Sequence, residues 1–237
     1  MENKILYVDG DSYTTPNMHV DIKDSYWSLF GNYVKISNIV NYAYPGKSNE
    51  GIFRNATRFI LDNNDKELFM LLGFTHLERY DVFDREHELR ILSGEPVRPL
   101  NLNPCEQGVV TKSYTQSSKE SDTLVYWHRE FDETKFLSNL INFSAFCQQK
   151  NVKFMLHYCS KPLVDPKIPL SESFFSEVQR IPNIINLFDN TYQTYNQKLK
   201  IKPADYEQYG WNGHHGPAGN KAYFEFLISK YNELYKA

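Results

Sequence analysis

The chain has few of the residues that mark disulfide-rich or zinc-binding proteins. Its 237 residues include three cysteines, Cys105, Cys147 and Cys159. They are an odd number and their spacing matches no metal-ligand pattern, which argues against a disulfide framework and against a zinc site. We expect Cys147 and Cys159 to be buried free thiols rather than reactive groups.

An excess of basic residues is also absent. Lys and Arg total 26 against 29 Asp and Glu, a formal net charge of −3, which argues against nucleic acid or an anionic membrane as the main partner. No segment approaches the roughly 20 consecutive apolar residues of a membrane span. A strand pattern begins at Lys4 and leaves no room for a signal peptide. We therefore expect a soluble protein that is not exported by the usual route.

Aromatic residues, in contrast, are abundant. They make up 15% of the chain, with 17 tyrosines and 16 phenylalanines. One interpretation is a core rich in aromatic side chains, and the other is an aromatic-lined surface for sugars or a partner protein. The composition leaves both open.

The apolar pattern alternates between strand-like and helix-like segments. Strands are expected at 4–8, 33–41, 67–75, 152–158 and 183–188, and helices at 24–32, 49–64, 132–151 and 217–236, with Asp132 as an N-cap. Such alternation predicts a parallel sheet with helices on both faces, whose ligands bind at the carboxyl ends of the strands.

The segment from about His87 to Arg129 interrupts this alternation. It is rich in Pro, Ser and Asn and has no sustained periodicity. Because it follows the third strand, we interpret it as an inserted loop or lid of a single domain spanning residues 1–237, and we expect it to border the site. A loop without regular structure is the alternative.

The stretch "ILYVDGDSYT" places two aspartates and a serine directly after the first strand. Asp9 and Asp11 fit the start of the D-x-D-x-T/V motif of haloacid-dehalogenase-type phosphatases, in which the first Asp attacks phosphorus. Tyr13 stands where that motif requires Thr or Val, and no convincing later acidic pair for magnesium follows. A phosphatase using Asp9 is therefore the third hypothesis.

Gly10-Asp11-Ser12 resembles the G-D-S block of the SGNH (GDSL-like) hydrolases, in which the serine is the nucleophile. The string "NYAYPGKS" resembles the second block of that family, N-x-A-x-x-G-x-[ST], and places Gly46 at the glycine whose backbone N–H helps to bind the oxyanion. "LLGFTH" falls where the third block, G-x-N-D, is expected. There Thr75 replaces the asparagine that donates its amide to the oxyanion, so Ser12, Gly46 and Thr75 are the candidate donors.

"WNGHHGPAG" resembles the last block, in which a carboxylate and the catalytic histidine precede the final helix. The alignment makes His214 the base, with His215 as the alternative, and puts Asn212 where the triad carboxylate belongs. Replacing that carboxylate by an amide can cost about 10⁴ in kcat. Asp205 or Glu207, in the preceding loop, is the alternative source of the charge. No ligand spacing supports a metal site at the two histidines.

The resemblance implies a three-layer α/β/α sandwich, flavodoxin-like, with a five-stranded parallel sheet of order 2-1-3-4-5. It implies a serine esterase that needs no metal or organic cofactor and removes acyl or acetyl groups from a carbohydrate. The expected substrate is a small-molecule or polysaccharide ester. The alternative is a weakly active or inactive carbohydrate- or protein-binding module with the same fold. The Asn- and Tyr-rich composition and the strings "GKSN…IFR" and "GFTHLERYD" also resemble phage-encoded members of the family. The expected location is therefore the cytoplasm or a phage virion.

Overall fold

The computed structural model describes the backbone of residues 3–15, 20–77, 79–83, 109–113, 122–160, 169–187, 189–210 and 213–236. Side chains are described in the same ranges except 79–83, 109–113, 122–131, 169–171 and 209. Within these residues no helix combines the length and the apolar character needed to cross a membrane.

The centre of the molecule is a parallel sheet with the order β2-β1-β3-β6. Its strands are β1 (Lys4–Gly10), β2 (Ile39–Asn41), β3 (Glu67–Phe74) and β6 (Lys153–Tyr158). The predicted order is confirmed, with one minor difference. The expected fifth strand is reduced to a single parallel bridge between Leu156 of β6 and Ile184.

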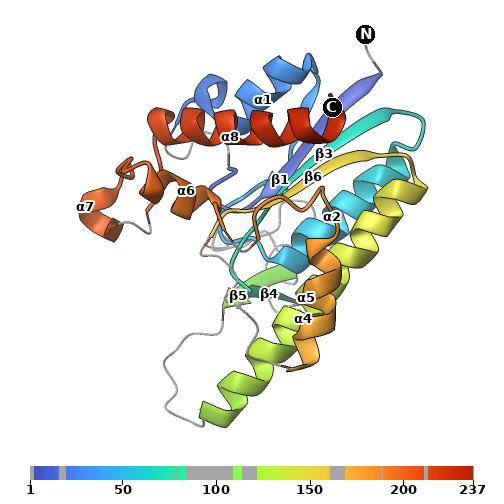
Figure 1. The fold of residues 1–237 in the computed structure, drawn as a ribbon, viewed down its shortest axis with the longest axis vertical. Coiled ribbons are helices and arrows are strands. Elements are labelled where there is room, and N and C mark those ends of the chain that lie inside the picture. Colours follow the sequence, from blue (N-terminus) through green and yellow to red (C-terminus); the bar gives the residue numbers. More distant parts are fainter. Residues whose placement is uncertain are drawn as a thin grey trace, which may run out of the picture.

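Helices cover both faces of this sheet, as Figure 1 shows. On one face lie α1 (Tyr26–Val34) and α8 (Pro217–Tyr235), and on the other lie α2 (Asn49–Asp62), α4 (Asp122–Gln149) and α5 (Pro169–Gln179). The remaining elements are η1 (Ile22–Asp24), α6 (Tyr192–Lys198), α7 (Tyr206–Tyr209) and the antiparallel pair β4 (Arg79–Phe83) and β5 (Val109–Ser113).

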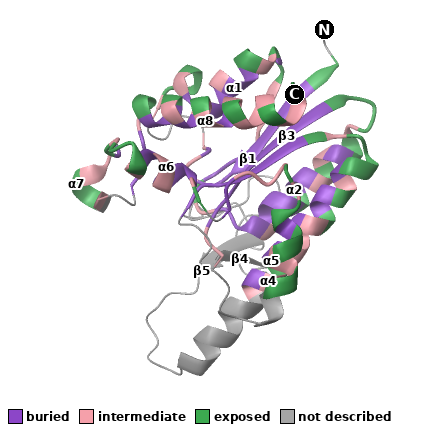
Figure 2. Ribbon diagram, viewed as in Figure 1, coloured by how far each residue is buried: buried purple, intermediate pink, exposed green. Residues whose placement is uncertain are grey.

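Alternate residues of β1 feed two separate cores. Leu6 and Val8 pack with the α1–α8 side, whereas Ile5 and Tyr7 pack with the α2–α4 side. In Figure 2 strands β1, β3 and β6 are accordingly buried throughout their central lengths, while α2 and α8 are buried along the face that meets the sheet. The continuous apolar runs that predicted a sheet covered on both faces therefore have their expected environment.

The prediction for residues 132–151 placed the start of that helix too late. α4 begins at Asp122, so Asp132 is an internal residue and not an N-cap. The expected insertion at 87–129 therefore contains β5 and the first turns of α4. Its other residues lie outside the described part of the chain, so its position beside the site stays a prediction. α5 and α6 were not predicted.

His157 on β6 lies in a polar cluster inside the α1–α8 core. Its ring Nδ1 is 3.1 Å from the Tyr223 hydroxyl and its Nε2 is 3.4 Å from that of Tyr26, and the residue is fully buried. Burial lowers the pKa of His157 to about 3. The folded protein therefore keeps this imidazole neutral in mildly acidic solution, because the charged form would be without water.

This burial predicts a loss of stability in acid. Below pH ~6.5 the unfolded chain protonates this histidine while the folded protein does not, so the unfolded state binds more protons and stability falls as the pH falls. His157 alone should contribute a slope of up to about 1.4 kcal/mol per pH unit until the pH approaches its folded pKa. Urea unfolding between pH 7.5 and 4.5 measures it, and His157→Gln should give a flatter curve. Parallel curves for the two proteins would contradict the prediction.

Candidate active site

Ser12 stands in a tight turn at the carboxyl end of β1. The backbone carbonyl of Asp11 accepts hydrogen bonds from the backbone N–H groups of Thr14 and Thr15 at 2.9 and 3.0 Å. The Asp11 side chain accepts the N–H of Tyr13 at 3.1 Å, as is typical of an Asx turn. This turn holds Ser12 partly exposed beyond the strand end, where ligands bind in parallel sheets.

His214 lies next to this serine, although 202 residues separate them in the chain. Its Nε2 is 2.8 Å from Ser12 Oγ. The histidine belongs to the segment that leads into α8, and α8 begins three residues later at Pro217. The close approach of Ser12 and His214 that the motifs predicted is thus present in the structure.

Asp205 holds the other side of the imidazole. Its Oδ2 is 3.0 Å from His214 Nδ1, and its Oδ1 accepts the backbone N–H of His214 at 2.6 Å. A backbone hydrogen bond from Ala204 N–H to the His214 carbonyl, 2.7 Å long, joins the two segments. Gly213 is needed for this contact, because a Cβ there would lie 2.9 Å from the Asp205 carboxyl carbon.

These contacts fix the tautomer of His214. Burial tends to raise the pKa of Asp205, but the two hydrogen bonds from His214 outweigh it and leave that pKa lower than usual. The ionised carboxylate can only accept, so Nδ1 carries the proton and Nε2 presents its lone pair to the Ser12 hydroxyl. The side chains of His214 and Asp205 are 20% and 11% exposed, so the pair is largely shielded but open to a substrate.

The other candidates from the last sequence block differ in their surroundings. The carboxylate that contacts His214 Nδ1 belongs to Asp205, whereas Asn212, which the motif places there, lies outside the described residues. The imidazole that contacts Ser12 Oγ belongs to His214. His215 is buried against Tyr192, and burial lowers its pKa to about 4. Glu207 is exposed on α7.

Gly46 occupies a sharp turn between β2 and α2. Its φ of 81° is in the left-handed region, and the N–H of Lys47 closes the turn onto the Tyr44 carbonyl at 3.4 Å. Proline followed by glycine with positive φ is typical of a type II turn. The turn is held on both sides: Tyr44 N–H donates to the Gly10 carbonyl at 3.3 Å, and Ser48 caps α2 by accepting the N–H of Gly51 at 2.9 Å.

The Thr75 hydroxyl and backbone N–H both donate to groups of the protein itself. The hydroxyl donates to Asp11 Oδ2 at 2.5 Å, and the backbone N–H donates to the Asn49 side chain at 2.8 Å. The side-chain amide of Asn49 in turn donates to the Thr75 carbonyl at 3.0 Å. Because the single hydroxyl proton is given to Asp11, Thr75 ties the end of β3 to the serine turn and has none left for an oxyanion.

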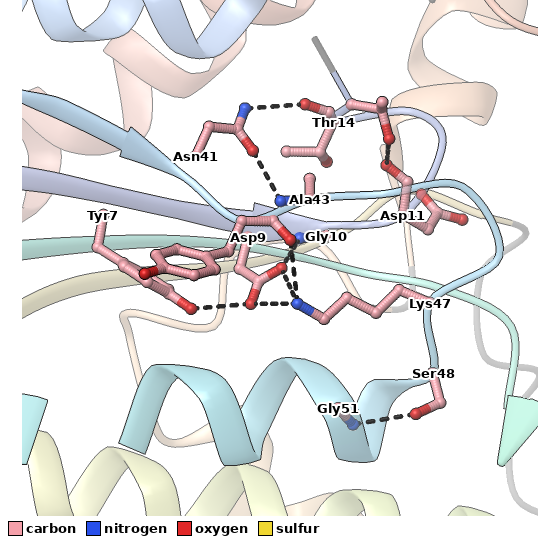
Figure 3. Close-up of polar contacts among 12 residues, drawn as sticks. Tyr7, Asp9, Gly10, Asp11, Thr14, Asn41, Ala43, Lys47, Ser48 and Gly51 are labelled. Carbon is pink, nitrogen blue, oxygen red and sulfur yellow. Dashed lines mark hydrogen bonds and ion pairs between the residues drawn. The ribbon is translucent and has the colours of Figure 1, made fainter. Parts of the chain in front are cut away.

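Asp9 is enclosed and cannot be a nucleophile in this arrangement. Its side chain is fully buried, and Lys47 Nζ lies 2.6 and 2.7 Å from its two oxygens (Figure 3). Burial raises the pKa of Asp9, an effect that Lys47 only partly offsets. A carboxylate without access to solvent cannot attack a phosphate ester, so the geometry argues against the phosphatase hypothesis. Among the described side chains no cluster of His, Cys, Asp and Glu suited to a metal ion was found.

Tyr13 forms an aromatic wall beside the histidine. Its ring centroid is 4.9 Å from that of His214 and 5.5 Å from that of Tyr192. Gln193 donates a hydrogen bond to the Tyr13 hydroxyl. The ring is partly exposed, so it belongs to the surface that a substrate at Ser12 would meet.

No protein-family model matches this sequence, and no curated protein matches it. Solved structures do. They include the psychrotrophic esterase EstA from Pseudoalteromonas sp., inhibited by monoethylphosphonate, with 13% identity, TM-score 0.49 and complete coverage of both chains. An acetylxylan esterase from Geobacillus stearothermophilus has 11% identity and TM-score 0.48, covering 97% of this chain and 94% of its own.

A member of the lipolytic protein G-D-S-L family from Veillonella parvula is a third, with 12% identity, TM-score 0.45 and 98% coverage of each chain. The esterase and lipolytic activities in these descriptions are those of the three similar proteins. At such low identities and TM-scores, a function for the present chain has to come from its own side chains.

Proposed function

We propose that this protein is a serine ester hydrolase in which Ser12, His214 and Asp205 form a catalytic triad. The observation that carries the proposal is one unbroken chain of contacts. Ser12 Oγ is 2.8 Å from His214 Nε2, and His214 Nδ1 is 3.0 Å from Asp205 Oδ2. A hydroxyl, an imidazole and a carboxylate in this order are what nucleophilic attack by serine requires.

In the proposed reaction, Ser12 Oγ attacks the carbonyl carbon of the ester while His214 Nε2 takes its proton. Asp205 stabilises the imidazolium that forms, and the proton then passes to the oxygen of the leaving alcohol as the carbon–oxygen bond breaks. Water activated by the same imidazole releases the acid from Ser12. The backbone N–H groups of Ser12 and Gly46 are the proposed oxyanion donors, and no metal or cofactor takes part.

The finer proposal concerns the substrate, for which we favour acyl or acetyl groups on a carbohydrate. The partly exposed Tyr13 ring beside His214 supports it, because aromatic faces pack well against the apolar faces of sugar rings. Release of acetate from an acetylated oligosaccharide, faster than from a small activated ester at equal concentration, would agree with this choice. Preference for a simple acyl chain would contradict it without touching the triad.

The proposed activity can be tested with p-nitrophenyl acetate, with and without EDTA, and with a fluorophosphonate probe. We expect turnover that EDTA does not affect, and a single adduct that peptide mass spectrometry places on Ser12. Hydrolysis of p-nitrophenyl phosphate that EDTA abolishes would instead favour phosphatase chemistry.

Absence of both turnover and adduct would favour the alternative, a non-catalytic carbohydrate- or protein-binding module that keeps the fold. The sequence argument for that alternative rested on the residues at positions 75 and 212. The carboxylate of Asp205 beside His214 removes half of that argument. The loss of a side-chain oxyanion donor at Thr75 remains, and it predicts a slower enzyme rather than an inactive one.

A further inference from the structure

A buried ion pair connects the end of β1 to the turn that contains Gly46, the proposed oxyanion donor. Lys47 Nζ contacts both carboxylate oxygens of Asp9 and donates a third hydrogen bond to the Tyr42 carbonyl at 3.1 Å. Asp9 also accepts the Tyr7 hydroxyl at 2.9 Å and the Gly10 N–H at 2.7 Å. Both charged side chains are completely inaccessible to water. Figure 3 shows the lysine side chain running from the loop to the end of β1.

Stability alone does not explain why this ion pair is buried. Removing two charges from water costs several kcal/mol per ion, and apolar replacements of buried ion pairs are often as stable or more so. What the pair does provide is a short, directional connection between two segments that are 38 residues apart in the chain.

The location of the two residues indicates which segments are connected. Asp9 is three residues before Ser12, and Lys47 directly follows Gly46. The ion pair thus links the turn that carries the nucleophile to the turn that carries the second proposed oxyanion donor. The two segments are also joined by a 3.3 Å hydrogen bond from Tyr44 N–H to the Gly10 carbonyl and by a 3.1 Å hydrogen bond from the Asn41 side chain to the Thr14 carbonyl. The ion pair adds a connection through the side chain of the residue that adjoins Gly46.

We propose that Lys47 and Asp9 are positioning residues that set the separation between the Gly46 N–H and Ser12. The inference rests on the proposed hydrolase function and deepens it. Oxyanion donors act on the charge that develops in the transition state, and their effect depends on a placement accurate to a fraction of an ångström. Loosening the connection should therefore lower kcat and leave KM nearly unchanged.

The test must separate positioning from folding. Lys47→Met or Asp9→Asn alone leaves a buried charge without its partner, and both variants should unfold at lower urea concentration than the wild type. The double variant Asp9→Asn/Lys47→Met removes both charges and keeps a carbonyl oxygen at position 9. We expect it to recover most of the wild-type urea midpoint while its kcat for p-nitrophenyl acetate stays about 10- to 100-fold low and its KM changes less than about twofold.

Lys135→Met is the matched control. Lys135 of α4 forms a partly exposed ion pair with Glu50 of α2, and neither residue is part of the proposed triad or oxyanion turn. This variant should leave kcat, KM and the urea midpoint unchanged. Recovery of both midpoint and kcat in the double variant would overturn the proposal and leave the pair a purely structural role. A raised KM with unchanged kcat would also overturn it.

A second measurement does not depend on turnover. ¹⁵N relaxation dispersion of the Gly46 amide should show new exchange broadening in the double variant and none in Lys135→Met. An undisturbed Gly46 amide would overturn the proposal even if activity fell. Wild-type protein inactive on all esters would refute the proposed function, whereas the Gly46 signal would still show whether the ion pair positions this turn.

Discussion

Replacing Ser12 by alanine is expected to lower kcat for p-nitrophenyl acetate by roughly 10⁵- to 10⁶-fold, to a level set by the remaining groups of the site. The reason is that His214 then has no hydroxyl to deprotonate, and the covalent route is lost. Stability should change little, because Ser12 is partly exposed in its turn. Steady-state kinetics and the loss of the fluorophosphonate adduct measure the effect.

Ser229→Ala is the control for this substitution. Ser229 lies on α8, where its hydroxyl donates to Glu233 at an exposed position, so its loss should leave kcat unchanged. Activity of the Ser12→Ala variant within about tenfold of the wild type, a far smaller loss than removal of a nucleophile causes, would mean that the nucleophile is another group.

The parallel sheet with helices on both faces was predictable because it depends on patterns repeated along the chain, whereas its strand order was predicted from the resemblance to the SGNH hydrolases. Apolar runs such as 67–74 indicate strands buried on both faces, and the helical periodicity of 49–62 indicates a crossover helix. Their alternation leaves few topologies. The fifth strand was over-predicted because residues 183–188 have a strand-like composition, whereas the described residues 183–187 form a single bridge, at Ile184.

The close approach of Ser12 and His214 was also predictable, because the segments that contain them resemble the first and last sequence blocks of one hydrolase family. Ser12 follows the first strand by two residues, and His214 precedes the last helix by three. Elements of this kind meet at the carboxyl edge of a parallel sheet, so the two residues met as well.

The sequence could not identify the single residue whose carboxylate contacts His214. Asp205 is nine residues before His214, and only the path of the intervening loop brings the two together. That path depends on the Ala204–His214 backbone hydrogen bond and on the space left by Gly213, neither of which has a recognisable spacing. The sequence could narrow the choice to Asp205, Glu207 or a missing acid.

The Lys47–Asp9 pair was missed although the sequence contained a signal for it. Asp9 extends an apolar run that is buried on both faces, and a carboxylate in such a place needs a partner of opposite charge. The partner could not be identified from the sequence, because a lysine in a loop is ordinarily solvated. The partner of the Thr75 hydroxyl could not be identified for a related reason, since Asp11 is 64 residues away in the chain.

Asp205 should prove to be the working third member of the triad. Asp205→Asn is expected to lower kcat by about 10⁴-fold with little change in KM, because an amide can donate as well as accept and no longer imposes the Nδ1–H tautomer on His214. The imidazolium that forms in the transition state would also lose its counter-charge. Kinetics with p-nitrophenyl acetate measure the loss, and Glu207→Gln, the same change on an exposed neighbour, should have no effect.

Asn212 provides the opposing test. With Asp205 already bound to His214, Asn212→Asp alone should not raise kcat/KM, because Nδ1 has one proton and it is already donated. The same substitution made in the Asp205→Asn background can restore activity only if position 212 reaches the imidazole. An activating Asn212→Asp together with a silent Asp205→Asn would reverse the assignment and return the role to the position that the motif spacing first indicated. A large loss in Asp205→Asn that Asn212→Asp does not repair would instead show that this site has an intact triad whose acid comes from the loop before α7.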